Sequence, residues 1–243
     1  GDGAPIKKAH RICAAVGEMI HMATLVHDDV LDEAETRRRG RTVNSLRGNE
    51  TAVMLGDWLI SNSFHLCSLV GDTAVNVLFG ETTNTLCEGE LVQLSRREDP
   101  TLDEVTYMEI VRRKTAALVA TCCSLGARLS GASDEVQAAL GLYGERTGCA
   151  FQIQDDVLDL VGEEAVVGKT LGRDLEKGKT TLPVILQPPV MSGTVPHDSF
   201  DGRVNINFNL EVQDWDFLLA SGAIDPWERI LRFGQHEVSF TTE

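Results

Sequence analysis

Asp28-Asp29-Val30-Leu31-Asp32 recurs unchanged as Asp155-Asp156-Val157-Leu158-Asp159, and each copy lies in an apolar stretch with helical character. On a helix, the three aspartates of one copy are three or four residues apart or adjacent, so we expect their carboxylates to point to roughly one side. Like charges on adjacent turns repel. Mg²⁺ offsets that repulsion because it binds carboxylate oxygens and commonly bridges to substrate phosphates. Two such helices facing each other predict a cleft that holds several Mg²⁺ ions and a diphosphate.

A solvated acidic surface and a calcium site are the alternatives to this interpretation of the repeat. A single acidic stretch of this kind is usually a solvated helix face, but two identical copies with apolar flanks favour a metal site. A calcium-binding EF-hand loop requires Gly at its sixth position and Glu at its twelfth, and neither copy has that pattern.

Composition narrows the class of protein. The 243 residues are 42% hydrophobic, which is enough for a sizeable core, and the net charge of −15 argues against nucleic acid or anionic lipid as a partner. The chain contains no apolar run of about 20 residues, so the sequence predicts no transmembrane helix. No signal peptide opens the chain, and the six cysteines form no Cys-x-x-Cys pair. We therefore expect a cytoplasmic protein with reduced, buried thiols.

Periodic apolar residues predict an all-α first part, with Thr101 and Glu104 forming a capping box for the fourth helix. The expected helices span residues 6–33, 50–70, 73–95, 101–130 and 134–162. The character of the chain changes after Gln187, because Pro188-Pro189 stops any helix and residues 204–210 alternate as in a strand. We expect a helical domain over 1–187 and an atypical C-terminal segment over 188–243.

Several other side chains could face the acidic cleft. His21 shares a face with Asp28, although a histidine in such a helix is more often part of the core. The basic run 36–41 supplies arginines whose forked donors match phosphate oxygens. Lys114 either reaches the surface or binds an anion. The Gly- and Lys-rich segment 168–183 is either a solvated loop or a phosphate-binding one.

Together these motifs resemble the trans-polyprenyl diphosphate synthases, over about residues 9–187. The resemblance lies in His21 to Asp32 with Arg37-Arg38, in Lys114-Thr115, in Phe151 to Asp159, and in Gly168-Lys169 to Lys179-Thr180. It implies an isoprenoid-synthase-type helical bundle with a central active-site cavity, and a homodimer whose interface includes the 73–95 helix.

The resemblance also implies an activity: head-to-tail condensation of isopentenyl diphosphate with an allylic diphosphate, giving a long-chain polyprenyl diphosphate. The six aspartates of the repeat (Asp28, Asp29, Asp32, Asp155, Asp156 and Asp159) would bind Mg²⁺. Arg37, Lys114 and Lys169 would support the allylic diphosphate, and Lys179 would close over it. Gln152 and Thr115 would lie near the allylic group, and Arg38 and His21 would contact isopentenyl diphosphate.

Three features depart from the family pattern. The chain begins after the place of a Gly-Gly-Lys-Arg-type segment that binds isopentenyl diphosphate. Arg39-Gly40-Arg41 stands where the family has Gly-Lys-Pro, and residues 188–243 do not resemble the family's last helices. A non-catalytic or impaired partner subunit is therefore an alternative. A terpene cyclase is less favoured, because those enzymes usually replace the second aspartate motif.

Small residues just before the first aspartate motif predict a long product. In the family, bulky aromatics at the places of Ala23 and Thr24 stop the growing chain early. We therefore expect Ala23→Phe to shorten the product, as measured by sizing the products chromatographically. A mutant that makes the same chain length as the parent would show this assignment to be wrong.

Overall fold

A computed structural model describes residues 6–37, 40–161, 174, 177–186, 230–233 and 236–239. The chain divides into two compact units, Gly1–Gln187 and Pro188–Glu243, and the boundary falls at the Pro188-Pro189 composition change. In the second unit, strands β3 (Ile230–Phe233) and β4 (His236–Ser239) form an antiparallel pair. The strand expected over 204–210 lies outside the described residues.

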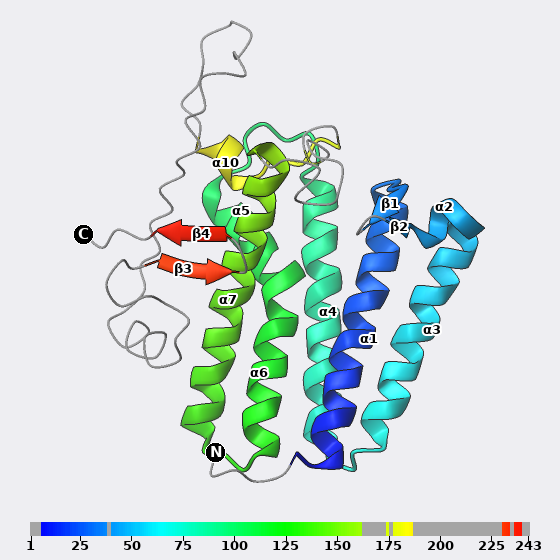
Figure 1. The fold of residues 1–243 in the computed structure, drawn as a ribbon, viewed down its shortest axis with the longest axis vertical. Coiled ribbons are helices and arrows are strands. Elements are labelled where there is room, and N and C mark those ends of the chain that lie inside the picture. The colour runs from blue at the N-terminus through cyan, green and yellow to red at the C-terminus, as the bar shows by residue number, and fades with distance from the viewer. Residues whose placement is uncertain are drawn as a thin grey trace, which may run out of the picture. The chain divides into compact units, whose positions relative to one another are not determined.

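The first unit is a helical bundle, which confirms the all-α prediction (Figure 1). Its long helices are α1 (Lys8–Leu31), α3 (Asn49–Ser68), α4 (Thr73–Ser95), α6 (Ala117–Leu129) and α7 (Asp134–Val161). Its short elements are β1 (Thr36–Arg37), β2 (Gly40–Arg41), α2 (Val43–Arg47), α5 (Glu104–Val111), the π-helix η1 (Arg112–Ala116) and α10 (Leu182–Ile185). Among the described residues, no helix is both long enough and apolar enough to cross a membrane.

The expected 101–130 helix differs from the observed one in two ways. The observed helix begins at Glu104, and its N-cap is Asp103. The carboxylate of Asp103 accepts a hydrogen bond from the Thr106 amide at 2.8 Å. The hydroxyl of Thr101 instead donates to Asp99. The helix is also composite, because η1 interrupts it between α5 and α6. Single π-turns of this kind frequently lie at functional sites.

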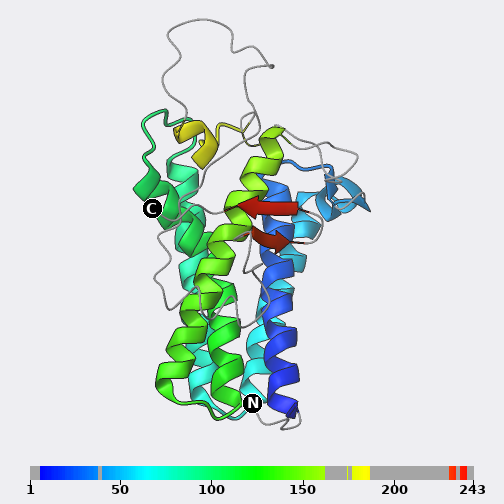
Figure 2. The ribbon, with the colours of Figure 1, turned by 60° about the vertical axis from the view of Figure 1, so that its left-hand side comes forward.

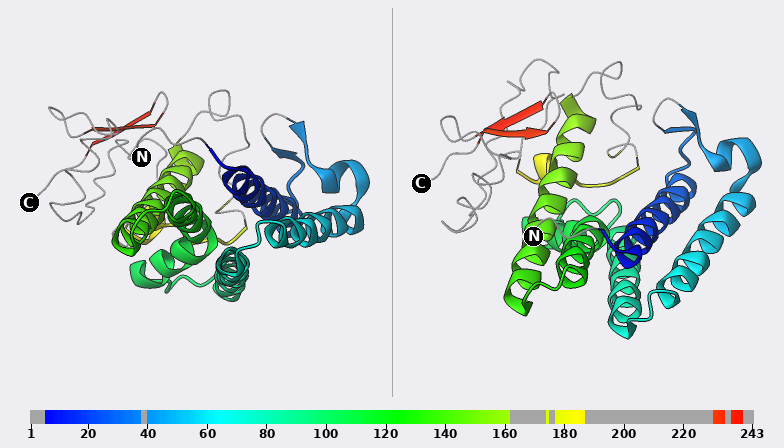
Figure 3. Two further views of the ribbon diagram at one scale, coloured as in Figure 1. Left: turned by 90° about the horizontal axis from the view of Figure 1, so that it is seen from below. Right: turned by 60° about the horizontal axis from the view of Figure 1, so that its bottom comes forward.

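The helices run alternately up and down the bundle. α1, α4 and α7 run in one direction, and α3 and the composite α5–η1–α6 run in the other (Figures 1 and 2). α1 packs on α3 and α6 packs on α7, while α4 packs on α6 and η1 (Figure 3). The C-terminal ends of α1, α4 and α7, which carry the acidic motifs and neighbouring polar residues, therefore lie at the same end of the bundle.

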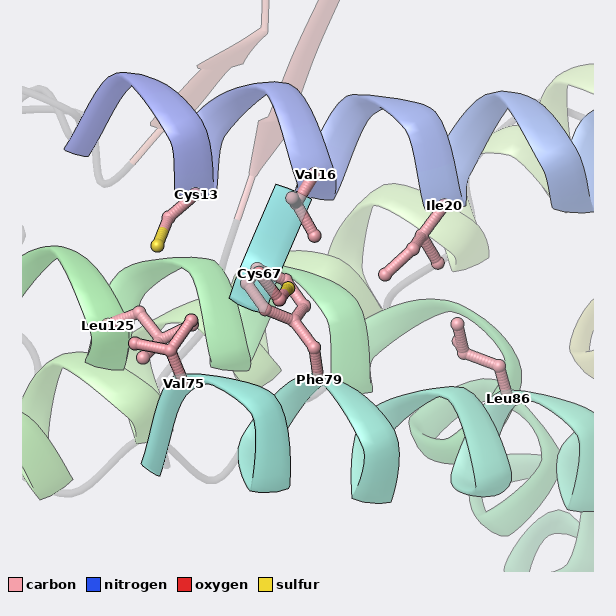
Figure 4. Close-up of a cluster of buried hydrophobic side chains, with 8 residues drawn as sticks. All are labelled: Cys13, Val16, Ile20, Cys67, Val75, Phe79, Leu86 and Leu125. Atoms are coloured by element: carbon pink, nitrogen blue, oxygen red, sulfur yellow. The ribbon is translucent and has the colours of Figure 1, made fainter. Parts of the chain in front are cut away.

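A single apolar core joins four of the helices (Figure 4). Its buried members are Cys13, Val16, Ile20, Cys67, Val75, Phe79, Leu86 and Leu125. The α1 members recur at intervals of three and four residues, so one face of that helix is buried.

All six cysteines are free thiols, but the expectation that they are buried holds for only some of them. Cys13, Cys67 and Cys149 are buried, whereas Cys87 and Cys122 are exposed. Burial raises the pKa of the Cys67 thiol to about 11, so this thiol stays protonated at neutral pH.

Glycine permits a close approach between α4 and η1. A Cβ atom on Gly89 would lie 2.6 Å from the backbone nitrogen of Lys114 and 2.8 Å from Cβ of Arg113. Because the first of these is a backbone atom, no side-chain rotation can relieve the clash. Gly89 thus sets how closely the Lys114 segment packs on α4.

We expect Gly89→Ala to lower the free energy of unfolding by about 1–3 kcal/mol, because overpacking forces backbone shifts. Chemical denaturation measures this change. Gly80→Ala is the matched control on the same helix, where a Cβ meets no atom within 4 Å. That control should be neutral or stabilising by up to about 1 kcal/mol, since alanine favours helix over glycine. Equal effects of the two substitutions would contradict the close-packing explanation.

Candidate active site

The first aspartate motif divides its carboxylates between two environments. Asp28 and Asp32, four residues apart at the end of α1, face cations from η1, from the turn after α4 and from residues 177–180. Asp29 is buried, and its Oδ1 instead accepts a hydrogen bond from Nε of Arg37 of β1 at 2.8 Å and forms an ion pair with Nη2 of the same arginine, also at 2.8 Å. The partner of Asp29 is thus an arginine of β1, whereas the partners of Asp28 and Asp32 come from other elements. Adjacent residues on a helix lie about 100° apart, which separates Asp29 from Asp28.

Lys114 projects from η1 into the acidic region. Its ammonium lies 3.5 Å from Oδ2 of Asp28, donates to Oε1 of Gln93 at 2.8 Å, and pairs with Glu90. Burial disfavours the charged amine, but Asp28 and Glu90 outweigh that effect and raise the pKa of Lys114. Of the two alternatives for this lysine, the structure rules out the surface one.

Asp32 is paired with two cations. Arg97 Nη2 lies 3.0 Å from Oδ1, and Lys179 Nζ lies 2.7 Å from Oδ2. Lys179 is also 3.7 Å from Asp174. Its segment is attached to the turn after α4, because the Glu98 amide donates to the Gly178 carbonyl at 2.8 Å. Gly178 has φ +68°, and a Cβ there would lie 2.7 Å from Cγ of Glu98, so both conformation and space favour glycine.

The middle aspartate of the second motif forms hydrogen bonds with side chains of α5 and α7. Asp156 accepts hydrogen bonds from the Tyr107 hydroxyl at 2.6 Å and from Nε2 of Gln152 at 2.8 Å. Gln152 in turn accepts from the Thr115 hydroxyl at 2.8 Å. Asp159 is buried and accepts a hydrogen bond from the Asp174 amide at 3.2 Å. Lys114 and Thr115 are adjacent, so η1 links the first motif to the second.

Burial makes two of these carboxylates reluctant to ionise. It raises the pKa of Asp156 to about 7, and it raises the pKa of Asp28 despite the nearby Lys114. A multivalent cation bound nearby would favour the ionised forms.

The carboxylate oxygens provide the donor chemistry that Mg²⁺ prefers. In the part of the chain that the structure describes, no three His, Cys, Asp or Glu side chains form a group that could hold a metal ion. The carboxylates of the first motif are paired with protein cations, whereas those of Asp156 and Asp159 accept hydrogen bonds from uncharged donors. The residues fit Mg²⁺ in chemistry, and holding the ion requires that some of these cations move away.

A family model described as polyprenyl synthetase matches residues 3–189. The chain belongs to this family. Octaprenyl diphosphate synthase of Escherichia coli K12 is 38% identical over 177 residues, covering 73% of this chain and 55% of the relative. Heptaprenyl diphosphate synthase component 2 of Bacillus subtilis 168 is 38% identical over 168 residues, covering 69% and 48%. The chain thus spans about half the length of the curated relatives it matches.

Solved structures of the polyprenyl synthetase family share the fold. A decaprenyl diphosphate synthase from Rhodobacter capsulatus superposes with a TM-score of 0.69 at 39% identity, covering 75% of this chain and 55% of that one. A polyprenyl synthase from Caulobacter crescentus CB15, complexed with calcium and isoprenyl diphosphate, gives a TM-score of 0.73 at 36% identity, covering 76% and 56%.

Most of the predicted site residues are found in this region of the family fold. The bundle brings together Asp28, Asp32, Lys114 and Lys179, and separately Thr115, Gln152 and Asp156. His21 is half-buried on α1, about 10 Å along the helix from Asp28 at 1.5 Å per residue. Arg38 and Lys169 lie outside the described residues.

Sequence reasoning missed the groups that orient these residues. Tyr107, Glu90, Gln93 and Arg97 had no assigned role, yet each contacts a predicted site residue. Glu90 and Gln93 lie on the same helix as Gly89, and that glycine was the available signal of a close approach. No comparable pattern marks Tyr107 or Arg97.

We expect Tyr107→Phe to lower the free energy of unfolding by about 1–3 kcal/mol, because it leaves a buried carboxylate oxygen without its donor. Chemical denaturation of a double-mutant cycle with Asp156→Ala isolates the pair. In the Asp156→Ala background, the tyrosine substitution should cost much less. An unchanged cost in that background would mean that the hydroxyl acts elsewhere.

Proposed function

We propose that this chain catalyses, as a Mg²⁺-dependent prenyltransferase, the head-to-tail condensation of isopentenyl diphosphate with an allylic diphosphate. The product is a long-chain polyprenyl diphosphate. The observation that carries the proposal is the placement of Lys114 and Thr115, which link the two aspartate motifs at one end of the bundle. The family membership and the names of the octaprenyl and heptaprenyl relatives support it.

Separation of charge dominates this reaction, because the C–O bond to the allylic diphosphate breaks before the new C–C bond is complete. The six aspartates of the two motifs (Asp28, Asp29, Asp32, Asp155, Asp156 and Asp159) would hold Mg²⁺. When bound, the metal stabilises the negative charge of the leaving diphosphate. Arg37, Arg38, Lys114, Lys169 and Lys179 would add positive charge around the two diphosphates, with His21 near isopentenyl diphosphate.

Thr115 and Gln152 have a separate role in this proposal. Their hydrogen bond places two polar oxygens beside the second motif, where the allylic group would lie. Such oxygens can stabilise a developing allylic cation without forming a covalent bond to it. The released diphosphate is then the base that accepts the final proton, so no protein nucleophile is needed.

Small residues below the acidic cleft support a long product. Ala23 is fully buried on α1, and the hydroxyl of Thr24 donates to the His21 carbonyl at 2.8 Å. Neither residue carries a ring that could stop a growing chain.

We also propose that the chain forms a homodimer through α3 and α4. Large apolar side chains stay exposed on these helices: Val53, Met54 and Trp58 on α3, and Val77 and Leu91 on α4. Trp58 is 59% exposed. Burying such side chains against a second copy is favourable, because it removes apolar surface from water. A non-catalytic subunit that pairs with a different chain is the alternative, and one relative is named component 2.

An extension assay tests the activity. Purified protein, Mg²⁺, farnesyl or geranylgeranyl diphosphate and labelled isopentenyl diphosphate are mixed, and the products are sized. We expect a long-chain product. Lys114→Met should lower its rate at least tenfold, because the substitution removes a half-buried cation beside the leaving group. Arg113→Met is the matched control, since Arg113 pairs with Glu109 and Glu88 outside the site. No product from the parent chain would favour the partner-subunit alternative.

A further inference from the structure

Arg97 occupies a position that no role in the proposed reaction explains. It follows the last turn of α4, and its Nη2 contacts Oδ1 of Asp32 at 3.0 Å. The other oxygen of Asp32 is contacted by Lys179 at 2.7 Å. Both oxygens of this predicted metal ligand are therefore paired with protein cations.

The two cations are not equivalent. Lys179 has a second carboxylate within 3.7 Å, that of Asp174, and its segment is anchored to the turn after α4. Among the described residues, Arg97 forms its ion pair with Asp32, and Nε of Arg97 is buried without a hydrogen-bond partner. The interaction of Arg97 with Asp32 therefore offsets the burial of a guanidinium nitrogen that has no hydrogen-bond partner.

We propose that Arg97 is a built-in counter-ion that competes with the divalent cation for Asp32 and so sets the metal concentration at which the site fills. This inference rests on the metal site of the proposed function. A carboxylate oxygen already paired with a guanidinium offers less charge to an incoming ion, and the ion must displace the guanidinium or share the oxygen with it. Arg97 is a positioning residue for Asp32, and it does not touch the reacting atoms.

The neighbouring residue provides the control. Arg96 belongs to the same turn and has the same charge, but it pairs with Asp99 at 3.1 Å and is 51% exposed. Arg97→Met and Arg96→Met each remove one positive charge from nearly the same place. Only the first substitution frees an oxygen of Asp32, so the difference between them separates displacement from a general change in charge.

The test is a titration with MgCl₂ alone at constant ionic strength, followed by the thermal unfolding midpoint and by calorimetry. Because binding to the folded state raises the midpoint, the titration gives the half-saturating Mg²⁺ concentration without any turnover. We expect Arg97→Met to lower that concentration about five- to tenfold, which is the lower end of a typical coupling between two sites. Arg96→Met should change it less than twofold. Arg97→Gln, which removes the charge but keeps a donor, should act in the same direction and serves if the methionine variant does not fold.

Two results would overturn the proposal. An unchanged or raised half-saturating concentration in the Arg97 variants would show that Arg97 does not compete with the metal. Loss of inorganic diphosphate binding at saturating Mg²⁺, without a gain in metal affinity, would make Arg97 a ligand of the anion instead.

The same titration separates this inference from the proposed function. A parent chain that binds no Mg²⁺ would contradict both. If Arg97→Met binds the metal more tightly but the parent chain gives no product in the extension assay, the counter-ion proposal is supported and the prenyltransferase proposal is contradicted.

Discussion

Balancing the buried negative charge at one end of the bundle is the constraint on which the rest of this structure depends. Two aspartate motifs on α1 and α7 would repel each other if nothing lay between them. η1 lies between them and supplies two adjacent residues with different chemistry. Lys114 brings positive charge to Asp28, and Thr115 brings a hydrogen bond to Gln152, which holds Asp156. A regular α-helical turn would not aim adjacent side chains in the same way, which is a physical reason for a π-helix here.

Small residues allow this arrangement because they let the helices approach η1 closely. Gly89 of α4 lies against the backbone of Lys114, and Gly148 of α7 lies against Ala116, where a Cβ would be 2.6 Å from Cα. The close approach of Gly89 fixes the backbone of Lys114. Glu90 and Gln93, on the same helix, contact its ammonium. Packing and electrostatics act on the same five-residue segment.

The two motifs share a sequence, and their middle aspartates also lie in similar environments. In each, the middle aspartate is buried and bonded to a side chain of another element, Arg37 for Asp29 and Tyr107 for Asp156. The outer aspartates of the first motif are paired with cations, Asp28 with Lys114 and Asp32 with Arg97 and Lys179. The contact made by the middle carboxylate fixes the end of each helix relative to a neighbouring element.

The sequence by itself determined the all-α architecture, the helices to within a few residues and the identity of the acidic motifs. Those features depend on local periodicity and on short-range spacing, which a single chain segment carries. Lys114, Thr115 and Gln152 could be proposed from the sequence, because each stands in a recognisable motif. The tertiary structure decided which carboxylates share a face, that Lys114 points inward, and that Tyr107, Glu90 and Arg97 join the site. Those outcomes arise from contacts between residues far apart in the sequence, such as Tyr107 with Asp156, 49 positions apart, and Arg97 with Asp32, 65 positions apart, and no local pattern records them.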